Sequence, residues 1–193
     1  MRFSSIIADL RDPNPRLSLD RPPRNLLNLA SRTYRPCPHC LTQNRFKLID
    51  ELAYEARCYA TNSLGKASEC ISGNHIVTDF ENCLGFEILG QAYTASGWHK
   101  DSLGAGTWVR CESGVKLWPV VASLNDQQRD DFVAYGEQWR PRTDEVPVLA
   151  LFPGDILIML AGNDNVHAPI TMEDCYMTGG MFWDSQSIHA TLR

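Results

Sequence analysis

From Ser72 onward the sequence is a series of short apolar runs, and this pattern constrains the fold more than any other feature. The runs are HIVTDF, GFEILGQAYT, GTWVRCE, VKLWPVVA, VPVLALF, DILIML and CYMTGGMF. They are rich in Val, Ile, Thr and aromatic residues, and several are bounded by Gly, Pro or Asn. Short runs of this kind between turn residues are typical of the strands of a sandwich or barrel. The sequence therefore predicts a mainly β domain.

A Pro-rich arm and a helix precede the strands. Residues 11–38 contain six prolines. Because proline interrupts helices and cannot donate to a central ladder, we expect an extended arm held to the surface by Leu26, Leu27 and Leu29. In the segment 44–60 apolar residues recur at spacings of three and four, which predicts an amphipathic helix. The residues of this apolar face are Phe46, Ile49, Leu52, Ala53 and Ala56.

One further helix is predicted among the strands, over Ser123–Trp139. Ser123 is followed three residues later by Asp126, an arrangement that suits a helix start. Phe132 and Tyr135 then fall on one face of this helix.

The composition is that of one globular domain with a core. The 193 residues, 44% hydrophobic and 21% charged, are ordinary values for such a domain. We expect an N-terminal arm and helix, residues 1–70, to pack on a jelly-roll core of residues 71–193. The net charge of −5 disfavours non-specific binding to nucleic acid.

No targeting or membrane segment is predicted. The amino end has only a short apolar stretch before Asp9, and the apolar stretch from Val146 to Ala161 is interrupted by prolines. We therefore expect a cytoplasmic or nuclear protein that does not associate with membranes. The seven cysteines lack the regular spacing of a disulfide scaffold, so we expect reduced thiols.

Candidate chemistry is concentrated around two histidines and a carboxylate. His99 and Asp101 are separated by one residue, so on an extended strand both side chains point to the same face. His167 follows the run DILIML, and strands distant in sequence can face each other in a sandwich. Two histidines and one carboxylate form the facial triad of non-haem Fe(II) oxygenases. A His-x-Asp pair also arises by chance at the surface, which is the alternative reading.

Lys116 is a candidate to bind a co-substrate in the same cavity. It lies 15 residues beyond Asp101 and follows a turn at Ser113-Gly114. An amine on the next strand could pair with the carboxylate of a co-substrate. The alternative is a solvent-exposed lysine on an edge strand.

Three segments, HKDSLGAGTWVRCESGVKLW, LFPGDILIMLAG and NVHAPITMEDCYMTGGMF, resemble the JmjC domain of the cupin-type 2-oxoglutarate-dependent oxygenases. The resemblance covers about residues 86–183, and the segment before it resembles the lead-in of small fungal JmjC-like proteins. It implies a double-stranded β-helix in which His99, Asp101 and His167 hold Fe(II) and Lys116 binds the distal carboxylate of 2-oxoglutarate. Ser96 lies where the family often has a Ser or Thr that contacts the co-substrate. Thr107 is a second candidate for that contact.

The chain also departs from the family's pattern. Val109 and Met181 stand where many members have Asn, which favours the alternative of a JmjC-like binding or regulatory module without turnover. A cupin that uses the triad with another metal is a second alternative. The intact triad and Lys116 favour an oxygenase, and Asp101 in place of Glu favours a hydroxylase over a lysine demethylase. The substrate, a protein or a small molecule, and the oligomeric state are left open by the sequence.

Other residues have simpler readings. Cys37-Pro38-His39-Cys40 matches a thioredoxin-like redox pattern or half of a zinc site, but a loop without chemistry is the favoured reading. His75 and His189 have no partner in the sequence. Cys111 and Cys175 lie in predicted strands, so we expect both to be buried.

Overall fold

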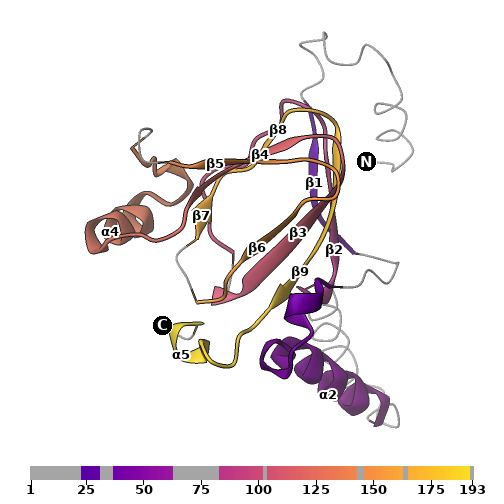
Figure 1. Ribbon diagram of the computed structural model, residues 1–193. Helices are drawn as coiled ribbons and strands as arrows, with labels where there is room; N and C mark the ends of the chain where they lie inside the picture. Colours follow the sequence, from indigo (N-terminus) through magenta and orange to yellow (C-terminus); the bar gives the residue numbers. More distant parts are fainter. Residues whose placement is uncertain are drawn as a thin grey trace.

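Two antiparallel sheets facing each other make up the body of the protein (Figure 1). A computed structural model describes residues 23–30, 37–62, 83–101, 104–142, 146–162 and 165–191. The strands are β1 Asn25–Ala30, β2 Phe86–Gly90, β3 Gly106–Ser113, β4 Lys116–Val121, β5 Val148–Leu151, β6 Ile156–Met159, β7 Val166–His167, β8 Ile170–Thr171 and β9 Cys175–Phe182. The helices are α2 Leu48–Asn62, α4 Asp126–Tyr135 and α5 Ile188–Thr191, with short 3-10 turns at His39–Leu41, Asn44–Phe46 and Gly136–Gln138.

The strand order is that of a jelly roll. The larger sheet runs β1-β2-β9-β3-β6, and the smaller sheet runs β5-β4-β7, with β8 also paired to β4. The segment between β2 and β3 adds to the smaller sheet through bridges from Ala95 to Ile170 and from His99 to His167. Successive segments thus pass back and forth between the sheets, as in a double-stranded β-helix. The mainly β jelly-roll fold predicted from the sequence is confirmed.

Side chains that alternate along the strands fill the space between the sheets. Phe86 and Ile88 of β2, Val109 of β3 and Met177 of β9 belong to one buried cluster that also includes Trp118. Gly179 lets the Phe86 ring lie across β9, because a Cβ at this glycine would be 2.6 Å from the ring. The core is therefore built by the period-two pattern of the predicted strands.

The predicted helix at 44–60 begins later, as α2, and follows a 3-10 turn at Asn44–Phe46. It lies beside the end of the larger sheet (Figure 1). Ile49 and Ala53 are buried, as expected, but Leu52 is exposed. Leu52 was wrongly placed on the buried face because the sheet covers a narrower stripe of the helix than the apolar spacing suggested.

The second predicted helix is α4, and its start differs from the expectation. Asn125, not Ser123, caps it. The Asn125 side-chain oxygen accepts a hydrogen bond from the Gln128 backbone N–H, and the Gln128 side-chain oxygen accepts one from the Asn125 backbone N–H. This reciprocal capping box satisfies two backbone donors. Phe132 packs on Trp139, but Tyr135 is 63% exposed, so the two do not share a buried face.

The described part of the arm is an edge strand. Residues 25–30 form β1, which pairs antiparallel with β2. The extended conformation predicted for the arm is therefore confirmed for this part, whereas the boundary predicted at residue 70 and the run at 75–80 lie outside the described residues. A bulge between Leu26 and Leu29 shifts the register of β1 against β2.

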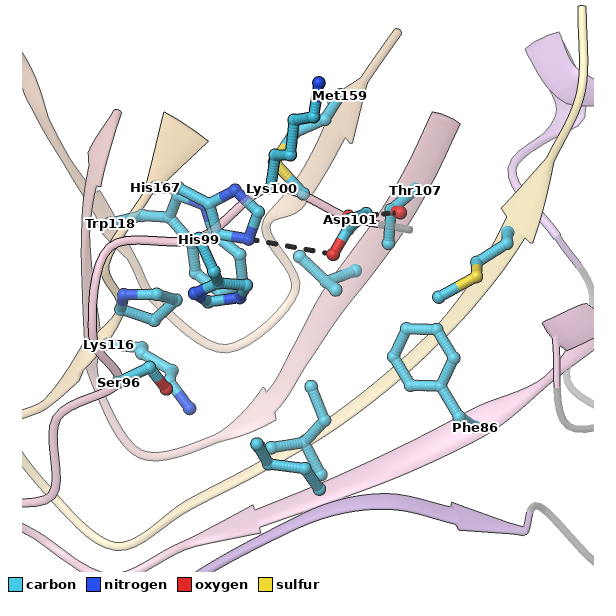
Figure 2. Close-up of a pocket in the computed structure, with 15 residues that line it drawn as sticks. Phe86, Ser96, His99, Lys100, Asp101, Thr107, Lys116, Trp118, Met159 and His167 are labelled. Carbon is cyan, nitrogen blue, oxygen red and sulfur yellow. Dashed lines mark hydrogen bonds and ion pairs between the residues drawn. The ribbon is translucent and has the colours of Figure 1, made fainter. Parts of the chain in front are cut away.

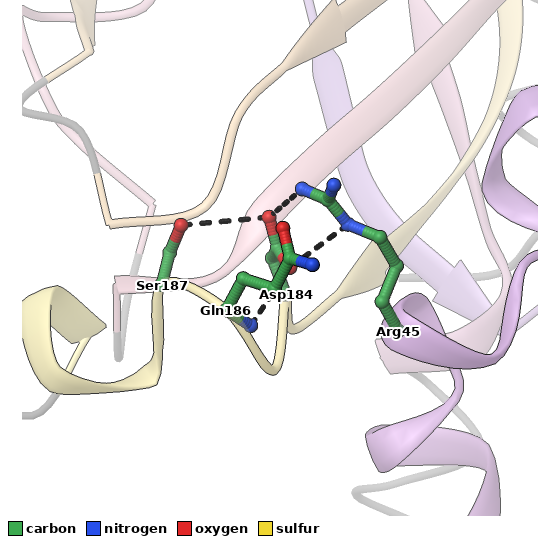
Figure 3. Close-up of polar contacts among 4 residues, drawn as sticks. All are labelled: Arg45, Asp184, Gln186 and Ser187. Atoms are coloured by element: carbon green, nitrogen blue, oxygen red, sulfur yellow. Dashed lines mark hydrogen bonds and ion pairs between the residues drawn. The ribbon is translucent and has the colours of Figure 1, made fainter.

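An ion pair fastens the segment before α2 to the end of β9 (Figure 3). The Arg45 guanidinium donates to both carboxylate oxygens of Asp184, and Ser185 donates its backbone N–H to the Arg45 carbonyl at 2.9 Å. Asp184 also accepts from the Gln186 backbone and the Ser187 hydroxyl. Burial alone would raise the pKa of Asp184, but the bonds from Arg45 and its neighbours lower it.

Arg45→Ala is expected to destabilise the fold by about 1–2 kcal/mol, because a hydrogen-bonded charge loses its partner. The value is at the low end for such bonds because the Arg45 side chain is 37% exposed. The pKa of Asp184 is lower in the folded chain than in the unfolded chain. The stabilisation is therefore fully present at pH values above the ordinary carboxyl pKa, and it is lost as the pH falls through the lowered pKa of the folded chain. Urea unfolding at pH 7 and at decreasing pH measures both effects.

Arg129→Ala is the matched control, because Arg129 pairs with the fully exposed Asp126 on α4. It should change the free energy of unfolding little. Equal losses for the two variants would contradict a fastening role for Arg45.

No helix among the described residues is long and apolar enough to cross a bilayer. Cys37, Cys40, Cys83, Cys111 and Cys175 are free thiols. This agrees with the reduced state predicted for them.

Candidate metal centre

Strand pairing brings the two candidate histidines together. His99 donates its backbone N–H to the His167 carbonyl at 3.0 Å, and His167 donates to the His99 carbonyl at 2.8 Å. These reciprocal bonds make the two residues direct cross-strand neighbours, and their ring centroids are 4.3 Å apart. The pairing of sequence-distant segments in the smaller sheet therefore brings two of the three candidate ligands together.

Asp101 completes the group, two residues beyond His99. One ligand atom from each of His99, Asp101 and His167 can be chosen so that all three lie within 4.8 Å of one another. The Asp101 carboxylate lies 3.9 Å from Nε2 of His167 and accepts a hydrogen bond from the Thr107 hydroxyl at 2.5 Å (Figure 2). The convergence predicted from the sequence is confirmed, and Thr107 holds the carboxylate in place.

The hydrogen bonds of the imidazoles prepare both rings to bind a metal. Nδ1 of His99 lies 2.8 Å from the Gly97 carbonyl, and Nδ1 of His167 lies 3.2 Å from the Asn165 carbonyl. A carbonyl only accepts, so each Nδ1 carries a proton, and in the neutral ring each Nε2 then has a free lone pair. Such outer bonds are the usual means of orienting metal-binding histidines.

Burial further favours the metal-binding form of His167. Its side chain is almost fully buried, and burial lowers its pKa, with His99 adding to the effect and Asp101 opposing it. A lowered pKa keeps the imidazole neutral at pH 7, as metal binding requires. Two imidazoles and a carboxylate are a donor set that suits Fe(II).

The triad opens onto a pocket of about 240 Å³ between the two sheets. Lys116 and Ser96 line it on the side opposite Phe86 (Figure 2). The lysine is 2% exposed, and the alternative of a solvent-exposed edge lysine is thereby excluded. Gly114 makes the turn before β4 possible: its φ is +78°, and a Cβ there would be 2.1 Å from the Asp174 carbonyl oxygen.

The Lys116 amine is buried without a carboxylate partner among the described residues. Burial lowers its pKa, while the nearby thiols of Cys175 and Cys111 act in the opposite direction. A buried cation is costly unless an anion compensates it. The pocket therefore has a place for an anionic group at its Lys116 side.

The sequence reasoning missed Trp118. It lies two residues after Lys116 on β4, lines the same pocket, and stacks on His167 with ring centroids 5.3 Å apart. No residue of the described chain accepts a hydrogen bond from its buried indole N–H. The same i, i+2 rule that paired His99 with Asp101 could have identified it.

A second aromatic group, Trp98 packed on Trp139, adjoins His99 in the chain through Trp98. Trp139 is buried against Trp98, with centroids 5.9 Å apart, in a cluster that includes Val166. Trp98 and Val166 each precede a metal-ligand candidate in the chain. The segment that follows α4 is thus packed against the chain neighbours of two triad residues.

The remaining candidates lie apart from the triad. Cys37 and Cys40 are exposed, and the group of three ligands found in the described residues does not include them. Burial raises the pKa of Cys37, with Asp50 contributing, which does not favour a reactive thiolate. His189 is exposed on α5, and His75 lies outside the described residues. Cys111 and Cys175 are buried, as predicted, with their Sγ atoms 3.9 Å apart.

Comparisons with known proteins give distant likenesses. No family model matches the chain. The KK-1 biosynthesis cluster protein D of Curvularia clavata is 31% identical over 164 residues, or 85% of this chain, and the chain spans 15% of the length of that relative.

Among solved structures, the ribosomal oxygenase YcfD of Escherichia coli, in complex with cobalt and 2-oxoglutarate, has a TM-score of 0.38 and 19% identity. That match covers 51% of this chain and 22% of YcfD. An oxalate decarboxylase variant of Bacillus subtilis has a TM-score of 0.35 and 11% identity, covering 53% of this chain and 21% of the decarboxylase. At such low similarity the fold assignment depends on the strand order described above.

Proposed function

We propose that the chain is an Fe(II)- and 2-oxoglutarate-dependent oxygenase. The observation that carries the proposal is the position of Lys116, a buried amine in the same pocket as the metal triad. A triad alone suits several metals and reactions. A buried amine beside it adds a requirement for an anion, which a co-substrate carboxylate fulfils.

The residues divide the work of binding between them. His99, Asp101 and His167 would hold Fe(II), and Lys116 would pair with the distal carboxylate of 2-oxoglutarate, with Ser96 beside it. The Thr107 hydroxyl already donates to Asp101, so it orients the metal ligand and could meet the co-substrate only as an acceptor. Iron, 2-oxoglutarate and dioxygen would together supply the oxidation of a C–H bond, coupled to decarboxylation of 2-oxoglutarate to succinate. The surrounding apolar side chains would limit the contact of the reacting groups with water.

A hydroxylase is the form of this activity that the chain favours. The acid of the triad is Asp101, and the resemblance to JmjC proteins associates Asp at this position with hydroxylases. Val109 and Met181 line the pocket as apolar side chains. They are the reason for keeping a JmjC-like module without turnover, or a cupin with another metal, as the alternatives to be tested.

Anaerobic titration distinguishes these possibilities. Adding Fe(II) and then 2-oxoglutarate to the full chain should produce a visible metal-to-ligand charge-transfer band, because the co-substrate would bind the iron directly. Iron binding without the band would point to a cupin that uses the triad alone. Failure to bind iron would point to a module without turnover, and either result would contradict the proposed oxygenase.

A further inference from the structure

The pocket has an apolar side that binding of a metal and a dicarboxylate leaves unexplained. The strands of the larger sheet contribute six aliphatic, aromatic or thioether side chains to its lining: Leu27, Phe86, Ile88, Val109, Met159 and Met181. Figure 2 shows Phe86 across the pocket from Lys116 and Ser96. The polar groups thus gather at the triad and at Lys116, and the larger sheet supplies the apolar side.

Leu27 is the most informative member of this apolar side. It belongs to β1, at the edge of the larger sheet, and lies within the register shift between Leu26 and Leu29. Leu27 is 52% exposed and does not belong to any of the buried clusters, yet it lines the pocket. An exposed apolar side chain at the mouth of a pocket can bury its surface against an apolar group of a molecule bound there.

The charges of the lining select against a cationic group. Asp101 is the only carboxylate among the described lining residues, and its oxygens serve Thr107 and the triad. Lys100 and Lys116 bring positive charge to the same pocket. Phe86 is the one aromatic ring on the apolar side, and the Trp118 ring is stacked on His167, so the two rings do not form the cage of several that recognises methylated ammonium groups. A neutral group is therefore favoured over a methylammonium group of the same shape.

The size of the pocket limits how much of a molecule can enter. Its 240 Å³ is below the ~300–1,000 Å³ of sites that enclose a drug-sized ligand. A co-substrate at Lys116 would use part of that space. What remains accommodates one side-chain-sized group, while the rest of the molecule stays outside the mouth.

We propose that Leu27, Phe86, Ile88, Val109, Met159 and Met181 form a subsite for a neutral aliphatic or aromatic group of the substrate. The substrate class is then a molecule that presents an apolar C–H-bearing group, and Leu27 is a specificity-determining residue. This inference rests on the proposed oxygenase function, but binding to the subsite is measured without turnover.

Two small molecules of equal shape test the proposal. 3,3-Dimethylbutan-1-ol and choline differ in carrying a neutral quaternary carbon or a cationic nitrogen. With methyl-labelled methionine in the full chain, the neutral alcohol should shift the signals of Met159 and Met181, which line the pocket. The exposed Met172 reports non-specific binding. We expect the alcohol to bind at least about tenfold more tightly than choline.

Leu27→Asp tests the role of the arm, since an acidic side chain at the mouth would attract choline and repel apolar groups. It should reduce the preference for the alcohol severalfold. Leu149→Asp, at a similarly exposed leucine on β5 outside the pocket lining, should leave the preference unchanged.

Equal binding of the two molecules, shifts confined to Met172, or an unchanged preference in Leu27→Asp would each overturn the subsite. These outcomes are independent of the charge-transfer band. An absent band with intact selectivity would contradict the oxygenase, whereas a present band without selectivity would contradict only the subsite.

Discussion

Asp101→Ala is expected to weaken metal binding by more than about a hundredfold and to abolish turnover. Loss of an outer-shell partner already costs roughly ten- to a hundredfold in metal affinity, and Asp101 would be a direct ligand that supplies the only carboxylate of the triad. Co(II) titration followed by visible absorbance measures the loss. It avoids the oxidation of Fe(II) during the measurement.

The same variant should leave the metal-free fold intact. The Asp101 side chain is 21% exposed, and its removal leaves only the Thr107 hydroxyl without its partner. Two nearby imidazoles do not require the carboxylate for packing, so the midpoint of thermal unfolding without metal should be unchanged or raised. Asp130→Ala, at an exposed carboxylate on α4, is the matched control and should alter neither property. Unfolding of metal-free Asp101→Ala would show that the carboxylate is structural.

The strand pattern was predictable because it depends on local rules. Each run from GFEILGQAYT to CYMTGGMF contains one strand, since alternate residues such as Ile88 and Val109 must face the other sheet. The exact limits depend on pairing. The run GFEILGQAYT stops being a strand at Gly90, where the chain leaves β9 and crosses to the other sheet.

The triad was predictable in part from local spacing and in part from topology. The spacing of His99 and Asp101 is local, whereas the approach of His167 depends on the antiparallel bridge between two segments of the smaller sheet. A jelly roll makes such a bridge plausible without determining its register. A shift of one residue in that register would have turned the His167 side chain to the opposite face.

Features that depend on irregular geometry could not be read from the sequence. The bulge between Leu26 and Leu29 breaks the regular pairing of β1 with β2 beside Leu27. The burial of Trp139 against Trp98 joins the segment after α4 to the segment between β2 and β3. Asn125 was missed as a cap because Ser123 offers the same chemistry two residues earlier.

Lys116→Ala should weaken 2-oxoglutarate binding roughly ten- to more than a hundredfold while leaving Fe(II) binding nearly unchanged. The loss follows because a charge-assisted hydrogen bond in a buried site is worth about 1.5–3 kcal/mol. Fe(II) binding should be spared because Lys116 forms no ion pair with Asp101 of the triad. Isothermal titration of 2-oxoglutarate into the anaerobic iron-loaded chain measures the loss. Because burial lowers the pKa of the free Lys116 amine and a bound carboxylate would raise it, the affinity should fall as the pH rises through the lowered pKa.

The free energy of unfolding of the metal-free chain provides a second measure of the protonation of Lys116. Between the lowered pKa of Lys116 and the ordinary lysine value, the unfolded chain binds more protons than the folded one, so the free energy of unfolding rises with pH across that window. Lys116→Met, of similar length but uncharged, should remove this rise and unfold at a higher temperature than the parent.

Lys100→Met is the control that identifies which amine meets the co-substrate, because Lys100 also lines the pocket but is exposed. It should leave 2-oxoglutarate affinity nearly unchanged, since water already solvates its charge. If Lys100→Met weakened 2-oxoglutarate binding and Lys116→Ala did not, the distal carboxylate would lie at the mouth of the pocket. The buried amine would then need another anion, and the assignment of 2-oxoglutarate to the space between Lys116 and the triad would fail.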